Sequence, residues 1–338
     1  MKAQITKWLN IGFLLLGLVL FVVFLIKMDH REVLAQVRRV GFNFVGAFSC
    51  YVLGLWVTTH AWKAILDSTR SRASFLDLFL AFWVGHAVNE VTPTGSMGEV
   101  LKGTMLRDKV ESDELIASIV VFNFLSTFSM QVFVLLGPLL SLCLLDLPAD
   151  IVWLLFGIAV LFFIPISGLF FLLRRGAAGL LVKLLLKLPF VRTKDPEAWA
   201  AKAKAIDDKV RGFYRNRPRD FWRSIFFYAC ARLLQAAELW FILLALLPEK
   251  NPGWLFLVAV LIQTASQLLS WAMTFVPGQL GVAEGGMAML FRLLGLSSLL
   301  GFSMEVVRRA RRVLGILIGL VIGWSLGISL RPMKARCL

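Results

Sequence analysis

Residues 75–99 read FLDLFLAFWVGHAVNEVTPTGSMGE, and this stretch decides how the chain is organised. It is mostly apolar as far as Val88, which is too short for a helix that must cross a hydrocarbon core of about 30 Å with about 20 residues. The polar continuation contains Pro93 and Gly95, both helix breakers. Broken backbone at membrane depth is tolerated only where it is buried in protein or lines a wet cavity. The sequence therefore predicts a helix that enters a bilayer, breaks and turns back.

A second break follows the apolar run Trp254–Val276, where residues 277–284 read PGQLGVAE. In both segments a glutamate follows the break, and an arginine follows that glutamate eight residues later: Glu99 with Arg107, and Glu284 with Arg292. Interrupted apolar segments in corresponding positions of two halves indicate a transporter binding site. We therefore predict two re-entrant hairpins in an inverted repeat, with halves at approximately 42–173 and 221–330.

The composition extends the membrane interpretation to the whole chain. Of its 338 residues, 59% are hydrophobic and 17% charged, whereas soluble domains have about 25% charged residues. The sequence predicts a single all-α, polytopic membrane domain over 1–338, with about six full spans besides the two hairpins. These spans are Trp8–Ile26, Phe42–Trp62, Leu115–Leu145, Ile151–Leu173, Phe221–Leu247 and Val313–Leu330.

The net charge of +15 is concentrated between the apolar runs. Lys and Arg are dense from Arg174 to Arg223, so the positive-inside rule predicts a cytoplasmic loop at 174–220, with interfacial helices. Both chain termini are then cytoplasmic. Charge placed in loops favours contact with anionic lipid, and no nucleic-acid partner is expected. The same scheme places Arg31, Arg38, Arg39 and Arg308–Arg312 toward the outer side, against the positive-inside tendency.

Catalytic and cofactor motifs are missing from the sequence. The three histidines have no metal-site spacing, and neither HExxH, Walker A, GxSxG, GxGxxG nor CxxC occurs. We expect no cofactor, no metal ion, no ATP-driven pump and no ordinary enzyme.

Ionisable residues that flank or interrupt apolar runs are candidates for function, because such groups are costly in lipid. Arg232 and Glu238 are six residues apart on one predicted helix, so we interpret them as structural groups that pair elsewhere. Glu99 and Glu284 follow the helix breaks and are better functional candidates. The helix N-termini formed after the breaks suit an anionic group. The arginines at 308–312 fit either phosphate binding or an interfacial anchor.

The two stretches NEVTPTGSMGE (89–99) and PGQLGVAE (277–284) resemble the flippase-like family defined by the transmembrane region of lysylphosphatidylglycerol synthases. An arginine near the start of the family's last span is matched by Arg308 or Arg309. The motifs depart from the commoner glycine-richer forms at Ser96, Met97 and Gln279. The resemblance implies lipid movement between leaflets of a bacterial inner membrane. The sequence resembles a stand-alone member of this family, without the aminoacyl-transferase domain, so lysyl transfer is not expected.

The leading hypothesis is a translocase for a phospholipid, a glycolipid or a polyprenyl- or hopanoid-type lipid, with an anionic headgroup as the expected ligand. Glu99 and Glu284 would gate the site, pair with arginines or carry protons. The alternatives are a non-transporting scaffold for lipid-synthesis enzymes and an integral-membrane enzyme acting on lipid headgroups. The residues predicted for lipid binding and gating are Asn89, Glu90, Pro93, Gly95, Gly98, Glu99, Arg107, Pro277, Gly278, Gly281, Glu284, Arg292, Arg308 and Arg309.

Overall fold

The computed structural model describes residues 38–66, 71–92, 97–144, 149–174, 211–272 and 282–326, together with positions 35, 204 and 208. The predicted span Trp8–Ile26 and most of the predicted loop at 174–220 lie outside these residues. Apart from one isolated bridge between Ser71 and Val110, the regular secondary structure of the described residues is helical, which confirms the all-α prediction. The helices are α3 (Asn43–Ile65), α4 (Phe75–Val91), α5 (Met97–Leu106), α6 (Ser112–Leu144), α7 (Ala149–Arg174), α10 (Pro218–Leu246), α11 (Pro252–Ala272), α12 (Val282–Leu293) and α13 (Ser298–Ser325).

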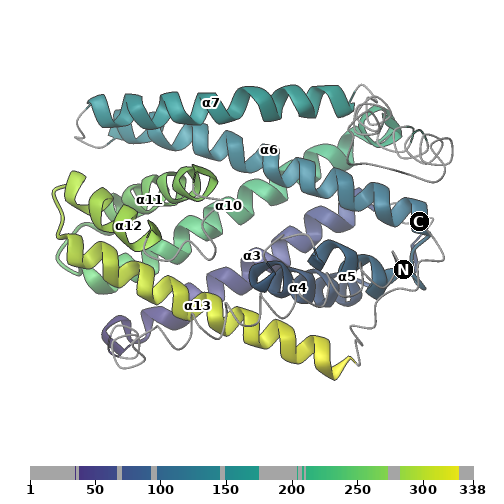
Figure 1. Cartoon of the computed structure of the whole chain (residues 1–338), viewed down its shortest axis with the longest axis horizontal. Coiled ribbons are helices and arrows are strands. Elements are labelled where there is room, and N and C mark those ends of the chain that lie inside the picture. The colour runs from purple at the N-terminus through teal and green to yellow at the C-terminus, as the bar shows by residue number, and fades with distance from the viewer. Residues whose placement is uncertain are drawn as a thin grey trace, which may run out of the picture.

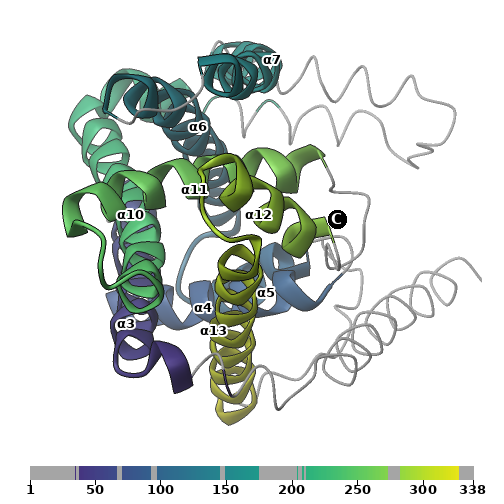
Figure 2. The ribbon, with the colours of Figure 1, turned by 90° about the vertical axis from the view of Figure 1, so that its left-hand side faces the viewer.

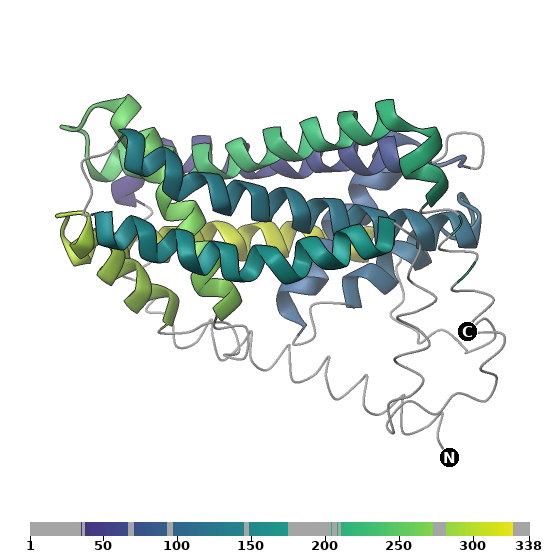
Figure 3. The same cartoon turned by 90° about the horizontal axis from the view of Figure 1, so that it is seen from above.

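The long helices run side by side along the longest axis of the molecule (Figures 1 and 3). Within the described residues, four segments are long and apolar enough to cross a membrane: Asn43–Ile65, Ser112–Leu140, Pro218–Leu246 and Pro252–Trp271. Outward-facing side chains on α7, such as Leu161 and Ile164, are apolar and exposed, as expected for a surface that contacts lipid.

The last span differs from its predicted bounds. The sequence predicts Val313–Leu330, but α13 begins at Ser298 and ends at Ser325. The arginines at 308–312 therefore lie in the middle of a long helix, not in a loop before it. A hydropathy pattern ends the span at these arginines, whereas in the fold acidic groups of α10, α4 and α13 itself pair with three of them.

Helices α3 and α10 form an antiparallel pair along one side of the molecule (Figures 2 and 3). Arg217, which precedes α10, donates hydrogen bonds to the carbonyl oxygens of Ala64, Ile65 and Leu66 at the end of α3. At the other end of the pair, Gly46 lies against the ring of Phe241. Arg217 thus satisfies carbonyl groups that a helix C-terminus leaves without partners.

Helices α4 and α5 fold back on each other as a helical hairpin at one end of this pair. A capping box between Ser74 and Asp77 starts α4. Asp77 also forms an ion pair with Lys109 at 2.6 Å, and the Arg72 amide donates to the Lys109 carbonyl oxygen at 2.8 Å. The start of α4 and the segment after α5 are therefore held together, so the two arms of the hairpin begin and end at the same place.

Helices α11 and α12 form a second folded-back pair. The Ser266 hydroxyl contacts the Met287 sulfur at 4.0 Å, and Gly286 packs against Leu269. Because α3 and α10 are antiparallel, α4 starts at one end of the bundle and α11 starts at the other (Figure 1). The two helical hairpins thus enter the bundle from opposite ends.

The element order is the same in the two parts of the chain: a long helix, two helices that fold back, and a second long helix. It runs from α3 to α6 and again from α10 to α13, with α7 in addition. The last helix of each part packs on the hairpin of the other part, with Gly319 of α13 against Ala87 of α4 and Gly137 of α6 against Thr264 of α11. Figure 2 shows this arrangement along the long helices.

Candidate functional site

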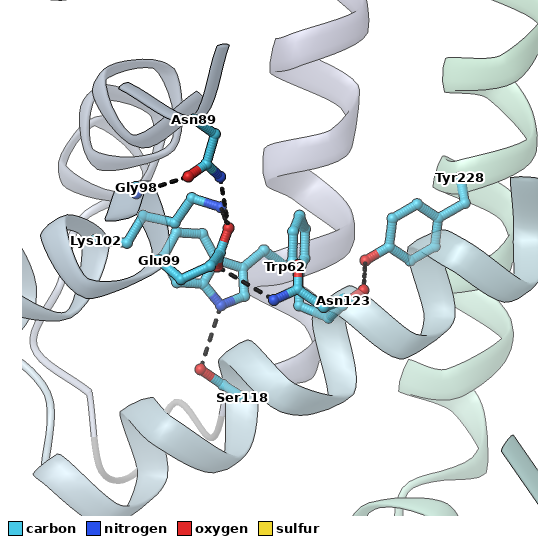
Figure 4. A network of polar contacts seen from close by, with 9 residues as sticks. Trp62, Asn89, Gly98, Glu99, Lys102, Ser118, Asn123 and Tyr228 are labelled. Carbon is cyan, nitrogen blue, oxygen red and sulfur yellow. Dashed lines mark hydrogen bonds and ion pairs between the residues drawn. The ribbon is translucent and has the colours of Figure 1, made fainter. Parts of the chain in front are cut away.

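A buried polar cluster lies where the first hairpin turns back toward α6 (Figure 4). The Glu99 carboxylate, in the first turn of α5, accepts hydrogen bonds from the side-chain amides of Asn89 at 3.1 Å and Asn123 at 3.2 Å. Lys102, one turn further along α5, forms an ion pair with it at 2.8 Å. Three helices, α4, α5 and α6, thus place their polar groups on one carboxylate.

Lys102 is the most deeply buried of these groups, with a side chain only 3% exposed. Its ammonium group lies 4.9 Å from the ring centre of Phe82, 5.2 Å from Phe122 and 5.9 Å from Trp62. Aromatic faces attract a cation, and the Glu99 carboxylate supplies the opposite charge. The pair therefore buries two charges as a neutral unit. Burying either charge alone would carry a much larger desolvation penalty.

The local sequence explains how α5 reaches this position. The Gly98 amide donates to the Asn89 side-chain oxygen at 2.6 Å, so Asn89 serves as an acceptor for the start of α5. A β-carbon on Gly98 would overlap the carbonyl oxygen of Gly85, so the close approach of α4 and α5 requires glycine. The α5 N-terminus is thus already supplied with an acceptor and with an acidic residue of its own, Glu99.

A second polar cluster is built on α13. Arg308 pairs with Glu305 at 2.9 Å and donates to the Ser266 hydroxyl on α11 at 3.2 Å. Arg311 pairs with Glu238 on α10 at 2.7 Å, and its guanidinium lies 4.5 Å from the ring centre of Tyr51. These side chains tie α13 to α11, α10 and α3.

Arg312 completes the cluster by reaching the first hairpin. Its guanidinium lies 3.7 Å from the Glu90 carboxylate, next to the end of α4, and the two side chains are 37% and 33% exposed. This is a looser and more solvated pair than Arg311 with Glu238, whose exposed fractions are 13% and 5%. Arg309, on the same stretch, is buried. The middle of α13 therefore contacts both hairpins, through Arg308 on one side and Arg312 on the other.

The structure groups the predicted site residues differently from their order in the sequence. Glu99 pairs with Lys102, while Arg107 is exposed and lies 3.5 Å from Asp108. Arg292 is exposed at the end of α12. Glu284 lies in the first turn of α12, and its side chain is outside the described part. Pro93, Gly95, Pro277, Gly278 and Gly281 also lie outside the described residues.

Several members of these clusters were not identified from the sequence. Lys102 follows Glu99 by three residues, a spacing that places both side chains on one helix face, so this pair was open to prediction. Asn123 is a polar residue in an otherwise apolar run, which is a weaker indication. Nothing in the local sequence connects Ser266 with Arg308, because that contact depends on how α11 and α13 cross.

The described residues hold polar groups suited to binding and holding charge, and they contain no group of three or more His, Cys, Asp or Glu side chains that could hold a metal ion. Neither the curated proteins nor the solved structures contain a match to this chain. The family model of the lysylphosphatidylglycerol synthase transmembrane region matches residues 10–319. This match confirms the resemblance, and together with the apolar helices it shows a multi-pass membrane protein of a lipid-handling family. The chain therefore belongs to the family of the lysylphosphatidylglycerol synthase transmembrane region.

Proposed function

We propose that the chain is a lipid translocase, which moves lipid headgroups between the leaflets through the polar interior of the bundle. The observation that carries this proposal is the position of the α13 arginines. Arg308 contacts the second hairpin and Arg312 the first, although the hairpins enter from opposite ends. Charged groups at this depth are expensive and are expected where a headgroup or an ion must pass.

In the proposed mechanism, the two hairpins form re-entrant elements of an inverted repeat, and each opens the interior to one side of the membrane. Alternating access then requires the ion pairs on α13 to separate on one side while they hold on the other. The pair between Arg312 and Glu90 is longer and more exposed than the pairs of Arg308 and Arg311, so of these three it should separate most easily. A lipid phosphate that approaches Arg312 would take the place of Glu90.

The sidedness of the proposal follows from charge. The end of the bundle at which α3 ends and α10 starts carries Arg72, Arg107, Lys109, Arg215 and Arg217. By the positive-inside rule we assign this end to the cytoplasm, with both chain termini on the same side, in a bacterial inner membrane. Arg72→Cys, in a chain otherwise free of cysteine, should react with an impermeant maleimide only after the cells are opened. Reaction in intact cells would reverse the assignment.

Transport in liposomes tests the proposal. The purified chain is reconstituted with leaflet-reporting phosphatidylglycerol, phosphatidylethanolamine, glycolipid and polyprenyl phosphate. We expect protein-dependent translocation of at least one of them, and its loss in Glu99→Gln and Glu284→Gln. Glu249→Gln is the matched control, because Glu249 is exposed in the loop after α10. Full activity in both Glu99→Gln and Glu284→Gln would remove these residues from the mechanism.

If folded wild-type protein moves no lipid of the panel, the scaffold for lipid-synthesis enzymes becomes the better account. A lipid product with an altered headgroup would instead favour an enzyme. Both outcomes contradict the translocase.

A further inference from the structure

One face of α10 is polar along most of its length and is turned into the bundle. Its members follow one another at spacings of three or four residues, which keeps them on a single face of the helix. They are Ser224, Tyr228, Arg232, Gln235 and Glu238. Ser224 donates to the Ala61 carbonyl oxygen at 3.2 Å, and the Tyr228 hydroxyl donates to that of Phe122 at 2.9 Å. Glu238 has its ion pair with Arg311.

Arg232, at the centre of this face, has no such charge partner among the residues that the structure describes. It is 8% exposed and lies midway between the two ends of α10. Its guanidinium donates to the Gln235 side-chain oxygen at 3.0 Å, and to the Ser126 carbonyl and hydroxyl oxygens at 3.2 and 3.0 Å. All three acceptors are neutral. The Nε atom is buried and has no hydrogen-bond partner, and no carboxylate of the described chain forms an ion pair with this arginine.

The other buried cations with resolved partners show that this is unusual within the molecule. Lys102 pairs with Glu99, Arg308 with Glu305 and Arg311 with Glu238. A buried charge without a counter-ion is strongly unfavourable, and most of all at the centre of a membrane helix. A guanidinium also presents five donors in a planar fork, which matches the oxygens of a phosphate group. The site therefore has the chemistry of an anion-binding site.

We propose that Arg232, with Ser126 and Gln235, binds a phosphate group between α10 and α6, and that the phosphate is that of a lipid headgroup. This inference rests on the proposed function and names the chemical class of its substrate. Ser126 lies three residues from Asn123 on α6, and Arg232 six residues from Glu238 on α10, which is about 9 Å along a helix axis. Arg232 thus lies between the Glu99 cluster and the α13 arginines, as an intermediate position for a headgroup.

Equilibrium binding tests this site without any need for transport. Radiolabelled phosphatidylglycerol is titrated against the purified full chain in detergent, with inorganic phosphate and a phosphate-free glucosyl diacylglycerol as competitors. Arg232→Gln should weaken phosphatidylglycerol binding by about tenfold or more, the loss typical of a hydrogen-bonded charge pair. Arg232→Lys keeps the positive charge but loses the planar fork of donors, so its affinity for phosphatidylglycerol should lie between those of the wild type and Arg232→Gln. Arg223→Gln removes an exposed arginine from the same helix and should bind as the wild type does.

The competitors identify the source of the phosphate. A lipid site predicts weak competition by inorganic phosphate and none by the glycolipid, whereas strong competition by inorganic phosphate would keep the anion site but assign it to a soluble ligand. Unchanged binding in folded Arg232→Gln, or in Arg232→Lys if the first variant does not fold, would overturn the proposal. Equal lipid transport by wild type and Arg232→Gln overturns this inference and leaves the translocase standing. If Arg232→Gln loses phosphatidylglycerol binding but the wild-type chain moves no lipid, the binding site stands and the translocase is contradicted.

Discussion

At the scale of single residues, the ion pair between Glu99 and Lys102 shows how this bundle holds charge. The pair is enclosed by the rings of Phe82, Phe122 and Trp62 and by two side-chain amides. Glu99 itself is 23% exposed, so the carboxylate is the member of the pair that a headgroup or a proton could reach. Lys102 is fully enclosed and holds the carboxylate in place.

This division of roles predicts non-additive stability. Lys102→Met leaves a carboxylate without its counter-ion, and Glu99→Gln leaves a buried ammonium group. We expect each to lower the free energy of unfolding by about 1–3 kcal/mol, and the double variant to lose less than the sum of the two. Chemical unfolding in detergent micelles measures all three. Additive losses would mean that the two residues do not act as a pair.

The sequence could indicate these residues only in part. A glutamate just after a helix break is conspicuous, so the sequence indicates Glu99, but the arginine that the repeated pattern associates with it is Arg107, eight residues later. Glu99 pairs with Lys102 instead, because residues three positions apart on a helix share one face, and both lie within α5. Arg107 lies after the end of this helix and faces solvent.

At the scale of elements, α13 depends on glycine where it crosses the first hairpin. A β-carbon on Gly319 would lie 2.6 Å from that of Ala87 and 3.0 Å from the ring of Trp83. The Trp83 indole also donates to the Gly315 carbonyl oxygen at 3.0 Å, which fixes the register of the crossing. Close contacts of this kind hold membrane helices together, because the bilayer supplies no hydrophobic force between them.

Gly319→Ala should therefore separate α13 from α4 and lower the thermal midpoint of unfolding, by an overpacking cost of about 1–3 kcal/mol. Gly157→Ala is the matched control, because Gly157 is also inside a helix and a β-carbon there meets no atom within 4 Å. It should leave the midpoint unchanged or raise it slightly. Equal midpoints for the two variants would show that the crossing is not close in solution.

The elements also show which helix bounds can be predicted from hydropathy and which cannot. The helices predicted from apolar runs at Phe42–Trp62, Leu115–Leu145 and Phe221–Leu247 are found within a few residues of those bounds. The start of α13 was missed by 15 residues, because four arginines interrupt its hydropathy. Their carboxylate partners Glu90 and Glu238 come from α4 and α10, far away in the sequence. Only the folded arrangement makes that part of the helix compatible with a membrane.

At the scale of the whole molecule, the arrangement of hairpins and long helices brings α13, like α6, into contact with both hairpins. The broken segments and their repetition were visible in the sequence, and they motivated the hypothesis of an inverted repeat. What the sequence could not supply is that the α13 arginines lie in the middle of that helix, where Arg308 contacts the second hairpin and Arg312 the first. Because residues in the middle of a helix do not count as loop charges, that position takes the α13 arginines out of the positive-inside comparison, whereas Arg38 and Arg39, exposed just before α3, remain in it.

The most direct test of the central claim is the liposome transport rate of the wild type and of a charge exchange across the first hairpin. Glu90→Arg and Arg312→Glu each place like charges together at the looser pair, and the double variant restores the attraction with the signs reversed. We predict protein-dependent translocation by the wild type, loss in both single variants and partial recovery in the double variant. Translocation at the wild-type rate in both single variants, or none in folded wild-type protein, would contradict a translocase that works through α13.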